Sequence, residues 1–449
     1  MARCCDEFAR AGAGLPPIEP GMPTPAGTGM TRRSFVARGA GLALAVYGGS
    51  RLGSAFLDDG IAQAAVGPAQ PVLVSVFLEG GADALSVLFP AGDPRYRELR
   101  PKLALPASSG IAFAEDSRLY WHPGAQGLAT LHGEGKVTVL PAVGYDHPDK
   151  SHFTSRHFWE VGATQTNLRT GWLGRYLDIA GTKDNPLQGL SLSTGLQPGL
   201  ATARVPVASL DSPDRYGFSD RKLGGTFPLE SSMLRAVGAL GSAHAVGSDP
   251  ALRQGGSTAQ QAEHLRNELA RFTSDYGTKV PYPTGNDPFP QRLAGLASML
   301  AAGLPLRCVT VTAPGHYDTH ADQASSLADG LKLTSDALLA FQRDLEQRGL
   351  ADRVLVHVWS EFGRRAKENG SAGTDHGAAG VGFLIGSRVR GGMIGEFPSL
   401  TSGLDSDGNL RATADFRGVY AALVEQWLGG DAARVIPGAA SFTRPVLLR

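Results

Sequence analysis

Short apolar runs alternate with amphipathic stretches along the chain from Pro71 onward. The runs with the length and β-branched content of buried strands are VLVSVFL (72–78), VTVL (137–140), CVTVT (308–312), VLVHVW (354–359) and VGFLI (381–385). Helical spacing of apolar residues predicts a helix over 327–345 that ends before Gly349 and another over 416–427, capped by Thr413 and followed by Gly429. Strands separated by helices are typical of a mostly parallel sheet with helices on both faces, so we predict an α/β fold.

The stretch over 191–290 has a different pattern, because the strand signal fades and polar loops dominate. It contains one amphipathic stretch, at 258–272, that predicts a helix, and its last part, 276–290, is rich in proline and glycine, as in a connecting loop. We therefore predict a single domain over 71–449 with a loop-rich insertion at about 191–290. A small separate domain is the alternative.

The N-terminal segment has the pattern of an export signal. Arg32 and Arg33 precede a weakly apolar stretch at 39–49, and Ala62-Gln63-Ala64 follows as a cleavage pattern. These features predict a twin-arginine signal over 1–64, with the twin-arginine translocase as partner and a periplasmic or secreted product. The alternative is a basic tail before a retained anchor, but the apolar stretch has about half of the ~20 residues that a membrane span needs. We therefore expect no stable membrane span.

Charge and cysteine content exclude several classes of function. The 449 residues carry 42 basic and 42 acidic side chains, so there is no reason to expect nucleic acid or an anionic membrane surface as a partner. Cys4, Cys5 and Cys308 are too few for a disulfide framework in the mature chain. Cys308 lies within an apolar run and is expected to be a core residue.

Acids, histidines and hydroxyls stand beside every predicted strand. They occur in EGGAD (79–83), DHPDKSHF (146–153), GHYDTHADQ (315–323), Ser360-Glu361, and Asp375-His376 just before the fifth strand. Ligands bind at the carboxyl ends of strands in α/β sheets, so we expect these groups to meet at one edge. Carboxylates and imidazoles are ligands of divalent ions such as zinc or manganese. The sequence therefore predicts a metal site at this edge.

Each of these residues also has an ordinary structural explanation. Asp318 and His320 are metal ligands or cap a helix, Asp83 is a ligand or part of a turn, and His376 is a ligand or a loop histidine. The pair Arg364 and Arg365 either clamps an anion or lies on a solvated face, and both interpretations stay open. Further histidines near these motifs are interpreted as structural or exposed, although each could supply an additional imidazole: His147, His152, His157 and His316.

An ordered set of motifs in this chain resembles the exported family called domain of unknown function 1501. The motifs are GGAD, SHF, Asp-Thr-His with Gln323 three positions further on, SEFGRR, GTDHG before an apolar strand, and Arg390-Gly391-Gly392. The resemblance covers nearly the whole mature chain. That family is related to the alkaline phosphatase and sulfatase superfamily, so the resemblance implies an alkaline-phosphatase-like fold with two metals at the carboxyl edge of the sheet.

The resemblance also implies roles for particular residues. It implies metal ligands at Asp83, Ser151, Asp318, His320, Glu361 and His376, with Ser151 also a nucleophile. Glu361-Phe362 stands where the superfamily usually has Asp-His, which indicates one imidazole ligand fewer. The formylglycine signature of sulfatases is absent, since the similar segment 212–215 has the wrong spacing.

The function implied is an exported metal-dependent hydrolase of phosphate or related esters. The cofactor is a divalent metal (zinc, manganese, magnesium or calcium), and the substrate is a small anionic ester. Ser151 or a water is expected to attack the ester, assisted by Arg364 or Arg365. The alternative is a non-catalytic exported protein that keeps the fold with at most one structural metal.

Overall fold

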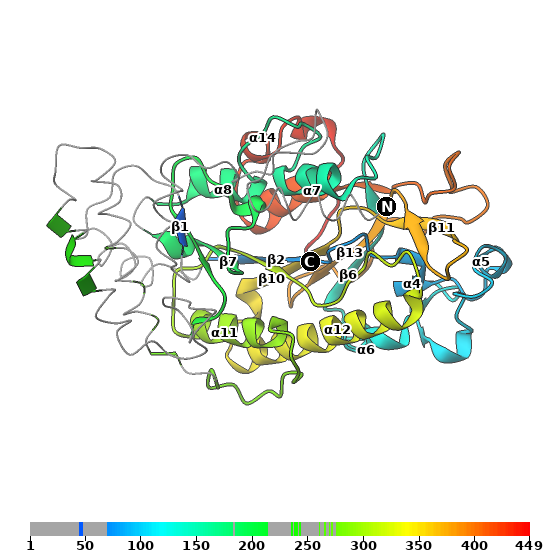
Figure 1. Cartoon of the computed structure of the whole chain (residues 1–449), viewed down its shortest axis with the longest axis horizontal. Helices are drawn as coiled ribbons and strands as arrows, with labels where there is room; N and C mark the ends of the chain where they lie inside the picture. Colours follow the sequence, from blue (N-terminus) through cyan, green and yellow to red (C-terminus); the bar gives the residue numbers. More distant parts are fainter. Residues whose placement is uncertain are drawn as a thin grey trace.

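The computed structural model describes residues 45–47, 70–182, 185–213, 235–236, 238–240, 242–243, 260, 265, 269, 271–272 and 275–449. Its centre is a mostly parallel sheet (Figure 1). Among the described residues, the strand order is β1 (Ala45–Tyr47), β8 (Val207–Leu210), β7 (Gly189–Leu192), β9 (Cys308–Thr312), β2 (Val72–Phe77), β10 (Val354–Trp359), β13 (Gly380–Ile385), β6 (Val137–Gly144) and β14 (Gly392–Met393), with β15 (Ala414–Asp415) also beside β6. The predicted α/β class is confirmed.

In the middle of the sheet, β13 runs against both of its neighbours. β13 pairs antiparallel with both β10 and β6, whereas β10, β2 and β9 are parallel to one another. The first residues of β13 therefore lie at the same edge as the last residues of β10 and β6. This direction brings the chain segment before β13 to the carboxyl edge of the parallel strands.

Helices cover both faces of the sheet, as Figure 1 shows. The helices on one face are α6 (Gln126–Gly133), α11 (Phe289–Ala301) and α12 (Gln323–Gln347), and those on the other are α7 (His152–Val161), α8 (Trp172–Ala180), α13 (Phe416–Ala422), continued by a π-helix (Leu423–Trp427), and α14 (Ala432–Val435). Alternate side chains of β2 enter the two cores, with Val74 in the first and Leu73 in the second. Burial on both faces explains why β2 is apolar except at Ser75.

Smaller elements surround the carboxyl edge. They are α4 (Ala84–Val87), α5 (Pro94–Leu99), a sheet of β3 (Leu88–Phe89), β5 (Tyr120–Trp121) and β4 (Ile111–Ala112), and a hairpin of β11 (Arg364–Glu368) and β12 (Thr374–His376). The hairpin occupies the chain between β10 and β13. It is the segment that holds GTDHG.

Most predicted elements are confirmed, and two details are different. The strand of the fourth apolar run and the glycine after α12 are as predicted, with Gly349 at φ 68°. The N-cap of α13 is Asp415 and not Thr413, because the Asp415 carboxylate accepts from the N–H of Arg417. The end of β7 and all of β8 lie within 191–290, so the sheet extends into the expected insertion.

The predicted export signal lies outside the described residues, apart from β1, which pairs antiparallel with β8. Much of 214–274 also lies outside them. None of the helices in the described part of the chain combines the length and the apolar character that crossing a membrane requires.

Candidate metal centre

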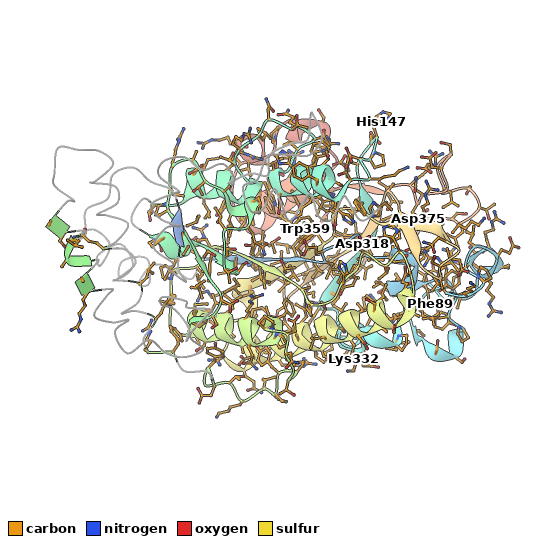
Figure 2. The ribbon with its side chains drawn as sticks, in the orientation of Figure 1. Phe89, His147, Asp318, Lys332, Trp359 and Asp375 are labelled. Carbon is orange, nitrogen blue, oxygen red and sulfur yellow. The ribbon has the colours of Figure 1, made fainter. Side chains whose placement is uncertain are left out.

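Asp318 is the centre of a group of histidines at the carboxyl edge of the sheet. Its Oδ1 atom lies 3.0 Å from Nε2 of His320, 3.2 Å from Nε2 of His376 and 3.4 Å from Nε2 of His152. The Nε2 atoms of His320 and His376 are 3.0 Å apart. Figure 2 labels Asp318 and also Asp375, which contacts His320. Ligand atoms of His152, Asp318 and His376 all lie within 4.8 Å of one another, so they could hold a metal ion.

The elements that carry this group come from distant parts of the chain. Asp318 and His320 lie in the loop between β9 and α12, His152 is the first residue of α7, and His376 ends β12. The antiparallel direction of β13 returns His376 to this edge.

Each imidazole is held through its other ring nitrogen. Nδ1 of His152 lies 2.6 Å from Oε1 of Glu361, Nδ1 of His376 lies 2.7 Å from the carbonyl oxygen of Lys150, and Nδ1 of His320 lies 3.3 Å from Oδ1 of Asp375. An oxygen acceptor at Nδ1 favours the tautomer that carries its proton there. With a cation in place, the Nε2 atoms would direct their lone pairs into the group, as in metal-binding histidines.

His152 gives the clearest test of whether a cation fits. Its Nε2 atom is buried and has no hydrogen-bond partner. Burial lowers the pKa of His152, but the carboxylates of Asp318 and Glu361 outweigh this and raise the pKa to about 9. Two carboxylates thus favour a positive charge at this ring, which is what a bound cation would also supply.

The spacing of the ligand atoms agrees with a small tetrahedral ion. Bonds of about 2.0–2.1 Å to zinc place neighbouring ligand atoms about 3.3 Å apart. The separations from Asp318 Oδ1 to the three Nε2 atoms range from 3.0 to 3.4 Å. The separations around Asp318 Oδ1 therefore agree with a divalent cation, and the ligand atoms of His152, Asp318 and His376 form a group within 4.8 Å that could hold one.

Arg364 fixes the loops that carry these ligands. Its guanidinium is fully buried and donates to Oδ1 of Asp318 at 2.6 Å. Its other acceptors are main-chain carbonyl oxygens, those of Gly80, Gly81, Tyr317 and Thr374. The solvated-face interpretation is therefore wrong for Arg364, and its donors are engaged within the protein. Arg365 is half-buried, and its Nε atom makes no hydrogen bond.

Glycine lets two of these loops approach closely. Gly80 has φ 114°, which L side chains rarely adopt, and a Cβ atom there would overlap the main-chain nitrogen of Asp318. Gly373 is similarly close, since its Cβ would overlap the carbonyl group of His320. These contacts explain the glycines of GGAD and GTDHG in physical terms.

Asp83 lies in a separate buried cluster. Arg100 donates to both of its carboxylate oxygens, at 2.5 and 2.9 Å, and Ser86 and Gln323 also donate to it. Burial raises the pKa of Asp83, but Arg100 and these hydrogen bonds outweigh it and hold the pKa below its ordinary value. The Asp83 carboxylate is therefore paired with Arg100 and does not lie in the histidine group.

Glu361 and Ser151 both adjoin His152. Glu361 contacts Nδ1 of His152 and not the group of Nε2 atoms, and Phe362 packs with its ring centre 4.8 Å from that of His152. Ser151 directly precedes His152 as the N-cap of α7. The structure thus brings Asp318, His320 and His376 together and places Glu361 and Ser151 next to His152.

The sequence predicted His152 to be structural or exposed and allowed it only as an additional imidazole, so His152 was not among the predicted ligands. Its place at the start of a helix after a strand was a signal that could have found it. The acceptors of the other imidazoles, the Lys150 carbonyl and Asp375, have no separate signal in the sequence.

The chain belongs to the family described as "Protein of unknown function (DUF1501)", whose model matches residues 141–409. This match includes all four residues of the histidine group. No curated protein matches the chain.

Several solved structures have a similar chain path at low identity. The periplasmic domain of EcEptC from Escherichia coli, in complex with Zn, is 9% identical with a TM-score of 0.38, covering 84% of this chain and 89% of that one. The PsFucS1 sulfatase from Pseudoalteromonas sp. is 10% identical with a TM-score of 0.35, covering 95% and 79%. The phosphonate monoester hydrolase SpPMH from Silicibacter pomeroyi is 12% identical with a TM-score of 0.32, covering 84% and 75%.

Proposed function

We propose that this chain is a metal-dependent hydrolase of phosphate or related esters, exported through the twin-arginine pathway to the periplasm or beyond. The observation that carries the proposal is the convergence of three imidazole Nε2 atoms on Asp318 Oδ1. The Arg32-Arg33 pattern supports export. A divalent cation at this group supplies positive charge, which lowers the pKa of a nearby hydroxyl or water and stabilises negative charge on an ester.

Asp318, His152, His320 and His376 are the ligands in this proposal. Their side-chain exposure rises from 7% at His152 and 9% at Asp318 to 17% at His376 and 24% at His320. The group therefore faces solvent on the side of His320 and His376, and a small anionic ester approaches from there.

Two further residues complete the proposed site. Ser151 precedes His152 at the N-cap of α7 and provides the hydroxyl that attacks the ester. Arg365 is the member of the arginine pair that contacts the anion, because the donors of Arg364 are engaged by Asp318 and carbonyl oxygens.

A specific observation also favours a second function, in which the ion is only structural. Four protein ligands fill a tetrahedral ion completely, whereas catalytic zinc sites keep one position open. Nε2 of His320 lies 3.0 Å from both Asp318 and His376, so we assign it as a fourth ligand beside the group of His152, Asp318 and His376. In this case the chain is a non-catalytic exported protein with one structural metal.

Hydrolysis assays with wild-type protein and the Ser151→Ala variant test the two functions against each other. The substrates are a phosphomonoester, a phosphodiester and a sulfate ester, each offered with added zinc and after chelation. The hydrolase proposal expects turnover that requires metal and falls by at least a hundredfold in Ser151→Ala, while the bound metal stays. Metal-loaded wild type without turnover on any of these esters supports the structural ion.

A further inference from the structure

Glu361 is a buried carboxylate whose oxygens are taken by the protein itself. It follows β10, is 1% exposed, and accepts from the main-chain N–H groups of Gly80 at 3.0 Å and Gly81 at 3.2 Å. The hydroxyl of Ser360 lies 3.1 Å from its Oε2. A metal bond to Glu361 would compete with these contacts.

Glu361 also contacts His152, whose Nε2 atom has no hydrogen-bond partner. Oε1 of Glu361 lies 2.6 Å from Nδ1 of His152, and Nε2 on the other side of that ring faces Asp318 at 3.4 Å. The Phe362 ring packs on His152 and also on His376, with 4.8 Å between ring centres in each case. The ring of His152 is thus held by a carboxylate on one side and packed against an aromatic residue.

We propose that Glu361 is a positioning residue that makes His152 a metal ligand and does not bind the metal itself. The carboxylate accepts the Nδ1 proton, fixes the orientation of the ring and increases the basicity of Nε2. This inference rests on the metal site of the proposed function. It replaces the direct coordination by Glu361 that the family resemblance implies.

The two roles differ in how substitutions combine. If Glu361 acts through His152, the Glu361→Gln substitution has no further effect on zinc affinity in a chain that already carries His152→Ala. If Glu361 is itself a ligand, the two losses add, because each variant then removes an independent contact. A double-mutant cycle on zinc affinity distinguishes them.

Zinc affinity is measured by competition with a chromophoric chelator on the full chain, for wild type, Glu361→Gln, His152→Ala and the double variant. Losing a supporting carboxylate typically weakens metal binding by about 10–100-fold, so the zinc affinity of Glu361→Gln is expected to be lower than that of wild type by a factor in this range. The double variant is expected to bind zinc as weakly as His152→Ala alone. Losses that multiply in the double variant would overturn the proposal.

Glu368→Gln is the matched control. Glu368 is also buried and accepts main-chain N–H groups, those of Lys102 and Leu103, but it does not contact a histidine of the group. Its zinc affinity is expected to equal that of wild type. If Glu368→Gln lost as much zinc affinity as Glu361→Gln, a buried glutamine at either position would disturb the site without acting through His152. That result would also overturn the proposal.

X-ray absorption of zinc-loaded wild type keeps the proposal testable if a variant does not fold. Three imidazoles and one carboxylate are expected around the ion, from His152, His320, His376 and Asp318. Two imidazoles and two carboxylates would overturn the role of Glu361 and leave the proposed function intact. Wild type that binds no zinc would end the proposed function and this inference together.

Discussion

Arg364 donates to Oδ1 of Asp318 at 2.6 Å, the same oxygen that three imidazoles approach. The guanidinium is fully buried and joins this oxygen to carbonyls of two other segments, at Gly80 and Thr374. Arg364 therefore holds together the loops that carry the histidine group. These contacts explain why a buried arginine follows soon after the apolar strand β10.

Replacing Arg364 by methionine should destabilise the protein strongly. The substitution keeps a long side chain but removes the donors that Arg364 supplies to Asp318 and to several buried carbonyl oxygens. Breaking one partner of a buried ion pair costs about 3–5 kcal/mol in free energy of unfolding. Urea denaturation of the metal-free protein measures this, and Arg365→Met, at a half-buried position, should lose much less. Equal losses of unfolding free energy in the two variants would contradict this role of Arg364.

Asp83→Asn should lower stability without removing the metal. The neutral amide leaves the buried guanidinium of Arg100 unpaired, at a cost of about 3–5 kcal/mol in free energy of unfolding. Metal content should not change in the folded variant, because the Asp83 oxygens face Arg100. Asp93→Asn is the control, since Asp93 caps an exposed helix start and asparagine caps equally well. If folded Asp83→Asn lost its metal, Asp83 would be a metal ligand after all, as the sequence predicted.

The stabilising effect of Asp83 should depend on pH. Its folded-state pKa lies below the ordinary value of 3.8, so its contribution is fully present above that pH and is lost as pH falls through the folded pKa. The difference in unfolding free energy between wild type and Asp83→Asn should therefore be constant near neutrality and shrink below pH 3.8. Denaturation curves at a series of pH values measure it. A difference that grows in acid would show that the sign is wrong.

Gly80→Ala should damage both the fold and the metal centre. A side chain at φ 114° is strained, which costs about 1–3 kcal/mol, and its Cβ would push against the main chain of Asp318. Gly349→Ala is the control, because Gly349 also has positive φ, at 68°, but nothing lies within 4 Å of its Cβ. Both variants should lose stability in thermal unfolding, and only Gly80→Ala should lose zinc affinity.

The sequence predicted the parts of the fold that local patterns determine. Strands such as Val354–Trp359 and the helix Gln323–Gln347 have clear periodicity, so their positions could be predicted. β7 and β8 were missed because their sequences, GLSL and VASL, contain only one β-branched residue between them, so they do not stand out from the surrounding loops. The reversed direction of β13 depends on the hairpin before it, which no periodicity reveals.

The candidate site was predictable only in part. The motif residues Asp318, His320 and His376 do meet, because all three lie at strand ends on one edge. Glu361 and His152 are 209 positions apart, and nothing local indicates that one holds the other. Likewise, a carboxylate such as that of Asp83 is a common metal ligand, but nothing in the sequence indicates that Arg100 pairs with it in the folded chain.

Metal content of the purified full chain tests the central claim most directly. Protein prepared without chelator is analysed by inductively coupled plasma mass spectrometry, beside the variant that carries both Asp318→Ala and His376→Ala. We expect about one divalent ion per wild-type chain, since the ligands form one compact group, and none in the double variant. Wild type without metal, or a folded double variant with unchanged metal, would contradict the account.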